Sequence, residues 1–117
     1  MSGESLERWE REYRKGFTKP LLLKMLSKGR SYPYKLVKTI EEVTEGSIKI
    51  ATTNIYPTLR NLTDSGLVTK SEDEGSTRTY YELTTAGKAF LAEVERSVND
   101  FVRLMDKTLL GDHSEES

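Results

Sequence analysis

The spacing of apolar residues changes twice along this chain, and the order of those changes limits the folds open to it. Up to Gly66, apolar residues recur every three or four positions, as on one face of a helix. Between Leu67 and Leu83 they alternate with polar residues, as in paired strands. From Thr84 the helical spacing returns and continues to Leu109. The sequence therefore predicts a mainly α fold with one small β-hairpin.

The helical spacing before Gly66 begins with an amphipathic segment in residues 1–16. There Leu6, Trp9 and Tyr13 share one helix face, and Ser2 or Ser5 is suited to cap the helix.

Two further helices begin near prolines and end at glycines. Pro20 and Pro33 suit the first turn of a helix, where a proline costs no hydrogen bond. Gly29 and Gly46 mark the ends of these helices. The segment "SIKIA" after Gly46 is expected to be a short extended connection.

The fourth helix is expected over residues 53–65, in the stretch "TTNIYPTLRNLTDSGLV". Its N-cap is Thr52, Thr53 or Asn54, and Pro57 then falls in or just after the first turn, where it costs little. Gly66 suits a left-handed C-terminal cap. One side is apolar, with Ile55, Leu59 and Leu62, and the other presents Thr53, Tyr56, Arg60, Asn61 and Asp64.

The hairpin is expected to pair residues 67–69 with 79–83 around a turn that contains Gly75. Tyr80 and Tyr81 lie next to each other, so one is expected in the core and the other at the surface. A long helix over residues 85–110, capped by Thr84 or Thr85, follows.

Three helices followed by a hairpin make a winged helix-turn-helix, here with an extra N-terminal helix and a long C-terminal dimerisation helix. Residues 17–84 are expected to form a DNA-binding domain, with helix 53–65 entering the major groove. Residues 85–110 form the dimerisation helix, and residues 111–117 a disordered tail.

The final helix is longer than so small a core can cover, which predicts a homodimer. Its apolar stripe continues to the end of the helix, and the N-terminal helix is expected to join the same layer. The expected interface residues are Trp9, Tyr13, Phe90, Val94, Val98, Phe101, Met105 and Leu109.

Charge is unevenly distributed along the chain, although the net charge is only -1. Residues 15–70 hold ten Lys or Arg against four acids, a balance of +6, whereas residues 71–117 hold five against eleven, a balance of -6. The asymmetry indicates that one part of the molecule meets a polyanion, although solvated charged faces would give it too.

Double-stranded DNA is the expected partner, and the candidate contacts cluster around helix 53–65. Tyr56 has the alternative of packing at the core edge, and Arg60 that of pairing with Asp64. The threonines before and at the helix start can act as caps, as phosphate ligands or as both. The candidates are Thr52, Thr53, Asn54, Tyr56, Arg60, Asn61, Lys35, Lys38, Lys49 and, on the wing, Arg78.

Several other classes of protein are excluded or disfavoured. The absence of cysteine excludes disulfides and thiolate metal sites. The longest apolar run, Leu21 to Leu23, is too short to span a bilayer, and no signal-peptide core is visible, so a cytoplasmic protein is expected. The only histidine is His113, and there is no glycine-rich phosphate loop, so neither an enzyme nor a metal site is expected.

Two motifs resemble those of the PadR-like transcriptional regulators. The first, "IYPTLRNLTDSGLV", has the Tyr-Pro pair followed by spaced leucines and Gly-Leu-Val; the second, "TRTYYELTTAG", has the Arg, Tyr, Leu-Thr and Gly that join the wing to the last helix. Residues 17–110 are covered. The chain departs from the family at Thr53, where glycine is common, at the "YPY" entry to the helix that Pro33 opens, and at its acidic wing tip "SEDEG".

The resemblance implies a dimeric DNA-binding protein that usually represses transcription and in many members is released by a small aromatic molecule. No cofactor is expected. Such an effector would lie between two copies, near Trp9, Tyr13, Phe90, Phe101 and Met105, although a tight apolar interface explains the same residues.

The main alternative is a winged helix that binds proteins and does not read DNA. Such a module would be expected to expose apolar residues in the first turn of helix 53–65, whereas this chain has Thr, Asn, Tyr and Arg there. DNA-binding regulation is therefore the preferred interpretation.

Overall fold

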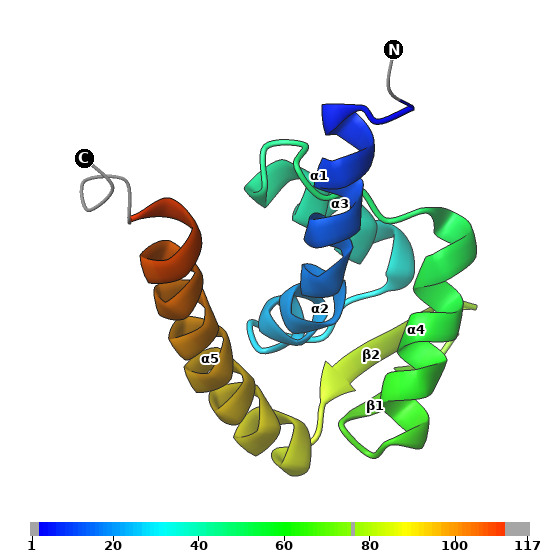
Figure 1. Ribbon diagram of the computed structural model, residues 1–117. Helices are drawn as coiled ribbons and strands as arrows, with labels where there is room; N and C mark the ends of the chain where they lie inside the picture. The colour runs from blue at the N-terminus through cyan, green and yellow to red at the C-terminus, as the bar shows by residue number, and fades with distance from the viewer. Residues whose placement is uncertain (1–2, 76, 112–117) are drawn as a thin grey trace, which may run out of the picture.

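The computed structural model describes residues 3–75 and 77–111 and has the order of elements that the sequence predicts. Figure 1 shows three helices packed beside a two-stranded hairpin, with one helix in front of them in the chain and a long helix leading away from them. The expected tail, residues 111–117, lies outside the described residues except for Gly111. The elements are α1 (Leu6–Arg14), η1 (Lys15–Phe17, a 3-10 helix), α2 (Thr18–Leu26), α3 (Pro33–Val43), α4 (Thr52–Asp64), β1 (Val68–Glu72), β2 (Thr79–Leu83), α5 (Thr85–Met105) and η2 (Asp106–Leu110, a π-helix).

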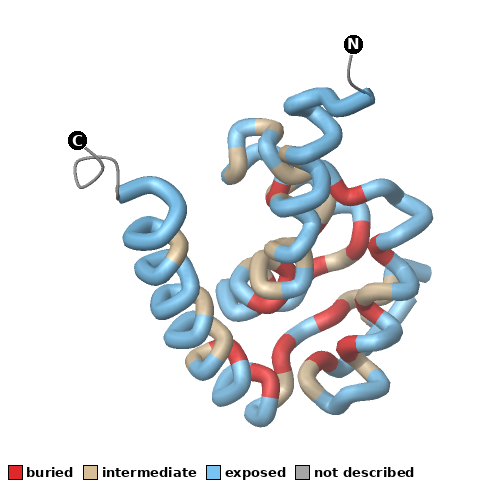
Figure 2. The backbone as a smooth tube through the Cα atoms, in the orientation of Figure 1, coloured by how far each residue is buried: buried red, intermediate tan, exposed pale blue. Residues whose placement is uncertain are grey.

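The core lies where α2, α3 and α4 meet the hairpin (Figure 2). Each of these elements contributes the apolar side chains that share one of its faces, so the core joins residues far apart in the chain. Burying such a side chain stabilises the fold by about 1.5–3 kcal/mol. The most deeply buried side chains are Leu22, Leu36, Ile40, Ile55, Leu59 and Val68.

The start of α4 differs from the prediction. The N-cap is Ala51, which has no side chain to cap with, and the helix runs over 52–64, one residue earlier than expected at each end. Pro57 is therefore the sixth helical residue, where an ordinary amide would donate to the Thr53 carbonyl. The expectation that Pro57 costs little is wrong, because the helix loses the one hydrogen bond that an ordinary residue would make at this position. Gly66 has the predicted left-handed backbone, with φ 80°.

The hairpin is antiparallel, with Val68 paired with Leu83 and Glu72 with Thr79. The loop between α2 and α3 joins it through Ser31, whose N–H donates to the Tyr81 carbonyl over 2.9 Å and whose carbonyl accepts from the Tyr81 N–H over 2.7 Å. Tyr81 is buried, as expected for one of the two tyrosines. These bonds attach the wing directly to the helical core.

Only the first part of α5 is covered by the core, at Gly87 and Leu91. Beyond Leu91 the helix leads away from α2, as Figures 1 and 2 show, and its last turn, η2, extends it to Leu110. A groove of about 430 Å³ lies between the two helices. The Lys24 Nζ to Glu95 Oε2 contact of 2.7 Å joins them.

The N-caps of α1 and α5 are each one of the two residues that the sequence offered for that helix. Ser5 Oγ accepts from the Arg8 N–H over 3.2 Å at the start of α1. Thr84 Oγ1 accepts from the Gly87 N–H over 2.9 Å and donates to the Gly66 carbonyl over 2.7 Å. Thr84 therefore caps α5 and also joins it to the end of α4.

Replacing Thr84 with alanine is expected to reduce the free energy of unfolding by about 1–2 kcal/mol, because both hydrogen bonds are lost. Thr85→Ala is the matched control, since Thr85 is exposed and is not the cap. Urea unfolding followed by circular dichroism measures both. Equal losses in the two variants would contradict the assignment of the cap.

Candidate nucleic-acid interface

The polar side of α4 is exposed because its apolar side is fixed against the core. Ile55, Leu59 and Leu62 are buried, so the residues on the other side of the helix face outwards. Tyr56 is 57% exposed, and Arg60 is exposed one turn later. The expectation of an exposed polar first turn, with Thr52, Thr53 and Asn54, is confirmed.

A concave surface, which encloses a volume of about 820 Å³, lies between α3, α4 and the wing. It brings together four of the predicted contact residues from three separate elements: Lys35 and Lys38 of α3, Tyr56 of α4, and Arg78 immediately before β2. The residues that line it are Tyr32, Pro33, Tyr34, Lys35, Lys38, Tyr56, Thr77, Arg78, Thr79 and Tyr81.

Tyr81, a buried residue of β2, is one of the residues that line this surface. Burial raises the pKa of its hydroxyl; nearby Tyr56 raises the pKa further, and the positive charge of Arg60 lowers it. With its pKa raised, the hydroxyl is protonated at neutral pH. A neutral hydroxyl in this position can donate to an acceptor and does not repel a polyanion.

Two tyrosines of this surface were not among the predicted contacts. Tyr34, in the first turn of α3, is 64% exposed. Tyr32 precedes the same helix, and the ring of Tyr32 lies under the Arg78 guanidinium, 4.0 Å from the guanidinium carbon. Both belong to the "YPY" sequence, which marked a departure from the family pattern but did not itself indicate a contact.

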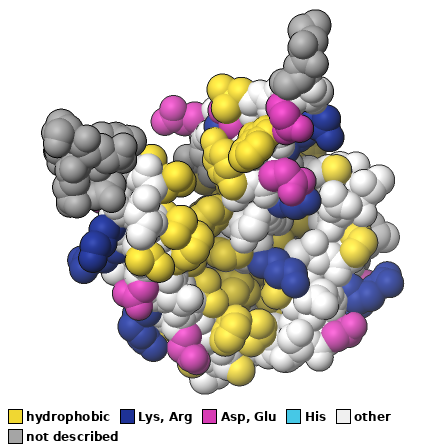
Figure 3. Space-filling view, in the orientation of Figure 1, with side chains coloured by type: hydrophobic (Ala, Val, Ile, Leu, Met, Phe, Trp, Pro, Cys, Tyr) yellow, Lys and Arg dark blue, Asp and Glu magenta, His cyan; other side chains and the backbone are white. Residues whose placement is uncertain are grey.

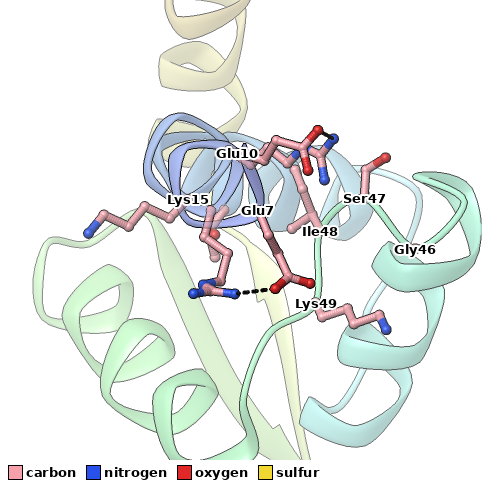
Figure 4. Close-up of a pocket in the computed structure, with 10 residues that line it drawn as sticks. Glu7, Glu10, Lys15, Gly46, Ser47, Ile48 and Lys49 are labelled. Carbon is pink, nitrogen blue, oxygen red and sulfur yellow. Dashed lines mark ion pairs between the residues drawn. The ribbon is translucent and has the colours of Figure 1, made fainter. Parts of the chain in front are cut away.

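Asn61 and Lys49 lie apart from the concave surface. Asn61 Oδ1 accepts a hydrogen bond from Lys19 Nζ over 3.2 Å, so Asn61 faces α2. Lys49 lies on the loop before α4, next to α1 (Figure 4).

Ion pairs dominate the pocket around Lys49. Its volume is about 500 Å³, and it is lined by both acidic and basic side chains of α1. Arg11 Nη1 lies 3.8 Å from Glu7 Oε1, and Arg14 Nη2 lies 3.4 Å from Glu10 Oε2, as the dashed lines in Figure 4 mark. Since the charges of α1 pair with each other, this pocket is less suited to a polyanion than the concave surface is.

The acidic wing tip is partly neutralised. Asp73 Oδ1 accepts from Arg30 Nη2 over 2.6 Å, and this hydrogen bond raises the pKa of the Arg30 guanidinium. One of the three adjacent acids, Glu72, Asp73 and Glu74, is therefore paired with a cation from the α2–α3 loop.

Within residues 3–75 and 77–111 there is no group of three or more His, Asp or Glu side chains placed to hold a metal ion. In that same part of the chain, no helix has the length and apolar character needed to cross a membrane.

A three-helix core, a hairpin wing and an exposed polar helix beside a basic concave surface define the winged helix-turn-helix class of regulators. The model of the transcriptional regulator PadR-like family matches residues 22–93. The chain therefore belongs to the PadR-like family of transcriptional regulators and, as the sequence predicted, is not an enzyme.

Sequence similarity to an individual protein supports this family assignment. The chain is 34% identical over 91 residues to the Escherichia coli protein named transcriptional regulator YqjI, and the match covers 78% of this chain but 44% of the relative. This chain thus spans less than half of that protein.

Two solved structures are also similar. A PadR family transcriptional regulator from Eggerthella lenta has a TM-score of 0.78 at 30% identity, with 91% of this chain and 93% of that chain covered. The structure of Bacillus subtilis PadR in complex with operator DNA has a TM-score of 0.58 at 29% identity, with 64% of this chain and 44% of that chain covered.

Proposed function

We propose that this protein is a homodimer that binds a palindromic operator sequence-specifically, inserts α4 into the major groove and represses transcription. In this proposal residues 17–84 form the DNA-binding domain and residues 85–110 the dimerisation helix. The concave surface that joins α3, α4 and the wing would receive the phosphate backbone and the groove edge.

The observation that carries the proposal is the convergence of Lys35, Lys38, Arg78 and Tyr56 on one surface. Two cations from α3 and one from the wing offer a shared site for phosphates, and release of counterions from the DNA would supply affinity for any DNA sequence. Sequence discrimination requires contacts to base edges, which the exposed α4 side chains are suited to make.

The residues are proposed to act in three groups. Tyr56 and Arg60 contact base edges, since an arginine fork matches the acceptors of guanine in the major groove. Lys35, Lys38 and Arg78 contact phosphates on either side. The first turn of α4 (Thr52, Thr53 and Asn54) contacts the backbone, and Asn61 and Lys49 are proposed as contacts at the flanks.

The similarity to Bacillus subtilis PadR supports this mode of binding, because that protein was solved in complex with operator DNA. A two-fold symmetric dimer would read an inverted repeat with half-sites about 34 Å apart, one helical turn of DNA.

The alternative of a protein-binding winged helix is less well supported. Its best argument is the acidic wing tip, and one of those acids is paired with Arg30. The first turn of α4 exposes polar side chains, where a protein-binding surface would be expected to expose apolar ones.

Arg60→Ala is expected to weaken operator binding about 5- to 150-fold, which corresponds to the roughly 1–3 kcal/mol of one bidentate base contact. The measurement is fluorescence anisotropy on DNA from upstream of the protein's own gene, compared with a shuffled DNA, across a salt series. Tyr56→Phe tests the tyrosine hydroxyl in the same assay.

Arg96→Ala is the matched control, because Arg96 is exposed on α5 and its loss changes the net charge equally. That variant should bind as the wild type does. Wild-type protein that binds neither DNA at low salt would overturn the proposed function and leave the protein-binding module in its place.

A further inference from the structure

Two arginines and two tyrosines are linked by successive ring contacts beside the turn end of the wing. The Arg30 guanidinium carbon lies 4.1 Å from the centre of the Tyr80 ring, and that of Arg78 lies 4.0 Å from the centre of the Tyr32 ring. The two rings meet edge to face, with centres 5.8 Å apart and planes at 89°. We refer to Arg30, Tyr80, Tyr32 and Arg78 as the Arg–Tyr ladder.

The ladder joins two segments that are distant in the chain and held together by other contacts. Arg30 and Tyr32 belong to the loop between α2 and α3, and Arg78 and Tyr80 to the second half of the hairpin. The backbone pair between Ser31 and Tyr81 fixes the register of the two segments. At the far end, Asp73 holds the Arg30 guanidinium over 2.6 Å. The rings therefore have fixed places before any ligand arrives.

Stacking restricts the one cation that the wing offers to the concave surface. Arg78 is an exposed side chain on a long, flexible stem, and Tyr32 and Arg78 both line the surface that also contains Lys35 and Lys38. A guanidinium stacked on a ring keeps its N–H donors in the plane of the group, directed outwards from its edge. A donor held in place before binding loses less conformational freedom when it binds.

We infer that Tyr32 is a positioning residue, which holds Arg78 in the orientation that contacts a DNA phosphate. This inference rests on the proposed function, and it assigns to the wing one phosphate contact that depends on an uncharged side chain. Tyr32 acts through Arg78, so its aromatic ring matters and its hydroxyl does not.

The test is the salt dependence of operator binding, measured by fluorescence anisotropy between 50 and 200 mM salt. The logarithm of the affinity falls as the logarithm of the salt concentration rises. Arg78→Ala should make this negative slope shallower by about 0.9, the value of one phosphate contact. Its affinity deficit relative to the wild type should therefore shrink about 3.5-fold over that range. Tyr32→Leu should change the slope in the same direction although it removes no charge, and Tyr32→Phe should keep the wild-type slope.

Three further measurements separate positioning from a general loss of structure. The double variant Tyr32→Leu with Arg78→Ala should bind within about twofold of Arg78→Ala alone, because both changes remove one contact. In the free protein, the ring current of Tyr32 should shift the proton NMR signals of Arg78 Cδ from their usual chemical shifts. This change in chemical shift should be lost in Tyr32→Leu and kept in Tyr32→Phe. Thermal unfolding verifies that each variant is folded.

The outcomes distinguish this inference from the proposed function. Wild-type protein that does not bind the upstream DNA would overturn both. Wild-type binding with an unchanged slope in Tyr32→Leu would overturn the role of Tyr32 alone. Equal losses in Tyr32→Phe and Tyr32→Leu would overturn it too, since they would mean that the hydroxyl itself contacts DNA.

Discussion

Replacing Gly87 with alanine is expected to reduce the free energy of unfolding by about 3 kcal/mol, a large part of the stability of a domain of this size. An added Cβ would lie 2.0 Å from the carbonyl oxygen and 3.0 Å from the carbonyl carbon of Leu67, and 3.1 Å from Leu83 Cδ2. The nearest group is backbone, so it cannot move aside by changing a rotamer. The Leu67 carbonyl also accepts the Thr84 N–H over 3.1 Å, which holds it in place.

Urea unfolding, compared with Gly16→Ala, measures this effect. Gly16 lies in the 3-10 helix after α1, and nothing lies within 4 Å of the position of its Cβ. The control should therefore differ from the wild type by no more than about 0.5 kcal/mol. The same unfolding midpoint in both variants would show that α5 can move away from the start of the hairpin without cost.

Sequence periodicity predicted the elements because each amphipathic face is encoded locally. The alternation after Gly66 and the return of helical spacing at Thr84 placed β2 and α5 correctly. Gly46, Gly66 and Gly75 have the positive φ values that helix ends and a turn require. Such features depend on a few neighbouring residues, so one sequence suffices to find them.

The start of α4 was harder to predict because three capping residues stand together before Tyr56. Propensity favours a side-chain cap, yet the helix begins at Thr52 after Ala51. The buried positions of Ile55 and Leu59 fix the helix against the core, and that packing outweighs the loss of one cap.

The candidate site was predictable in composition but not in arrangement. Basic residues of the helix-turn-helix segment and Tyr56 were found from residue type and spacing. The contact between Asn61 and Lys19 joins residues 42 positions apart, and the stacking of Arg78 on Tyr32 joins the wing to the α2–α3 loop. Contacts of this kind depend on how the elements pack, which local pattern does not encode.

The second large effect is expected from a substitution in the apolar stripe of α5. Phe90, Phe101 and Leu109 are 42%, 54% and 67% exposed, and Val94, Val98 and Met105 are half-buried. Figure 3 shows hydrophobic side chains gathered along the inner side of α5 and across the part of the molecule that it faces. On α1, Trp9 and Tyr13 are each 59% exposed. Contiguous apolar surface of this kind indicates an interaction site, and a second copy would cover both helices at once.

Phe101→Glu is therefore expected to convert the proposed dimer into a monomer and to weaken operator binding about 100-fold or more. The loss is large because two linked recognition helices bind with an effective concentration that a monomer lacks. The monomer should stay folded, since Phe101 makes no contribution to the buried core. Sedimentation velocity measures the first effect and fluorescence anisotropy the second.

Arg103→Gln provides the control, because it changes the net charge by the same amount on the far side of α5, about 160° around the helix. It should remain a dimer and bind normally. A wild-type protein that is monomeric at micromolar concentration would mean that something other than a second copy covers the stripe. A dimeric Phe101→Glu variant would instead place the interface elsewhere. If the Phe101→Glu variant is a monomer and the Arg103→Gln control is a dimer, α5 joins the two DNA-reading units. In that case dimerisation would depend on the apolar side of α5 and not on its far side.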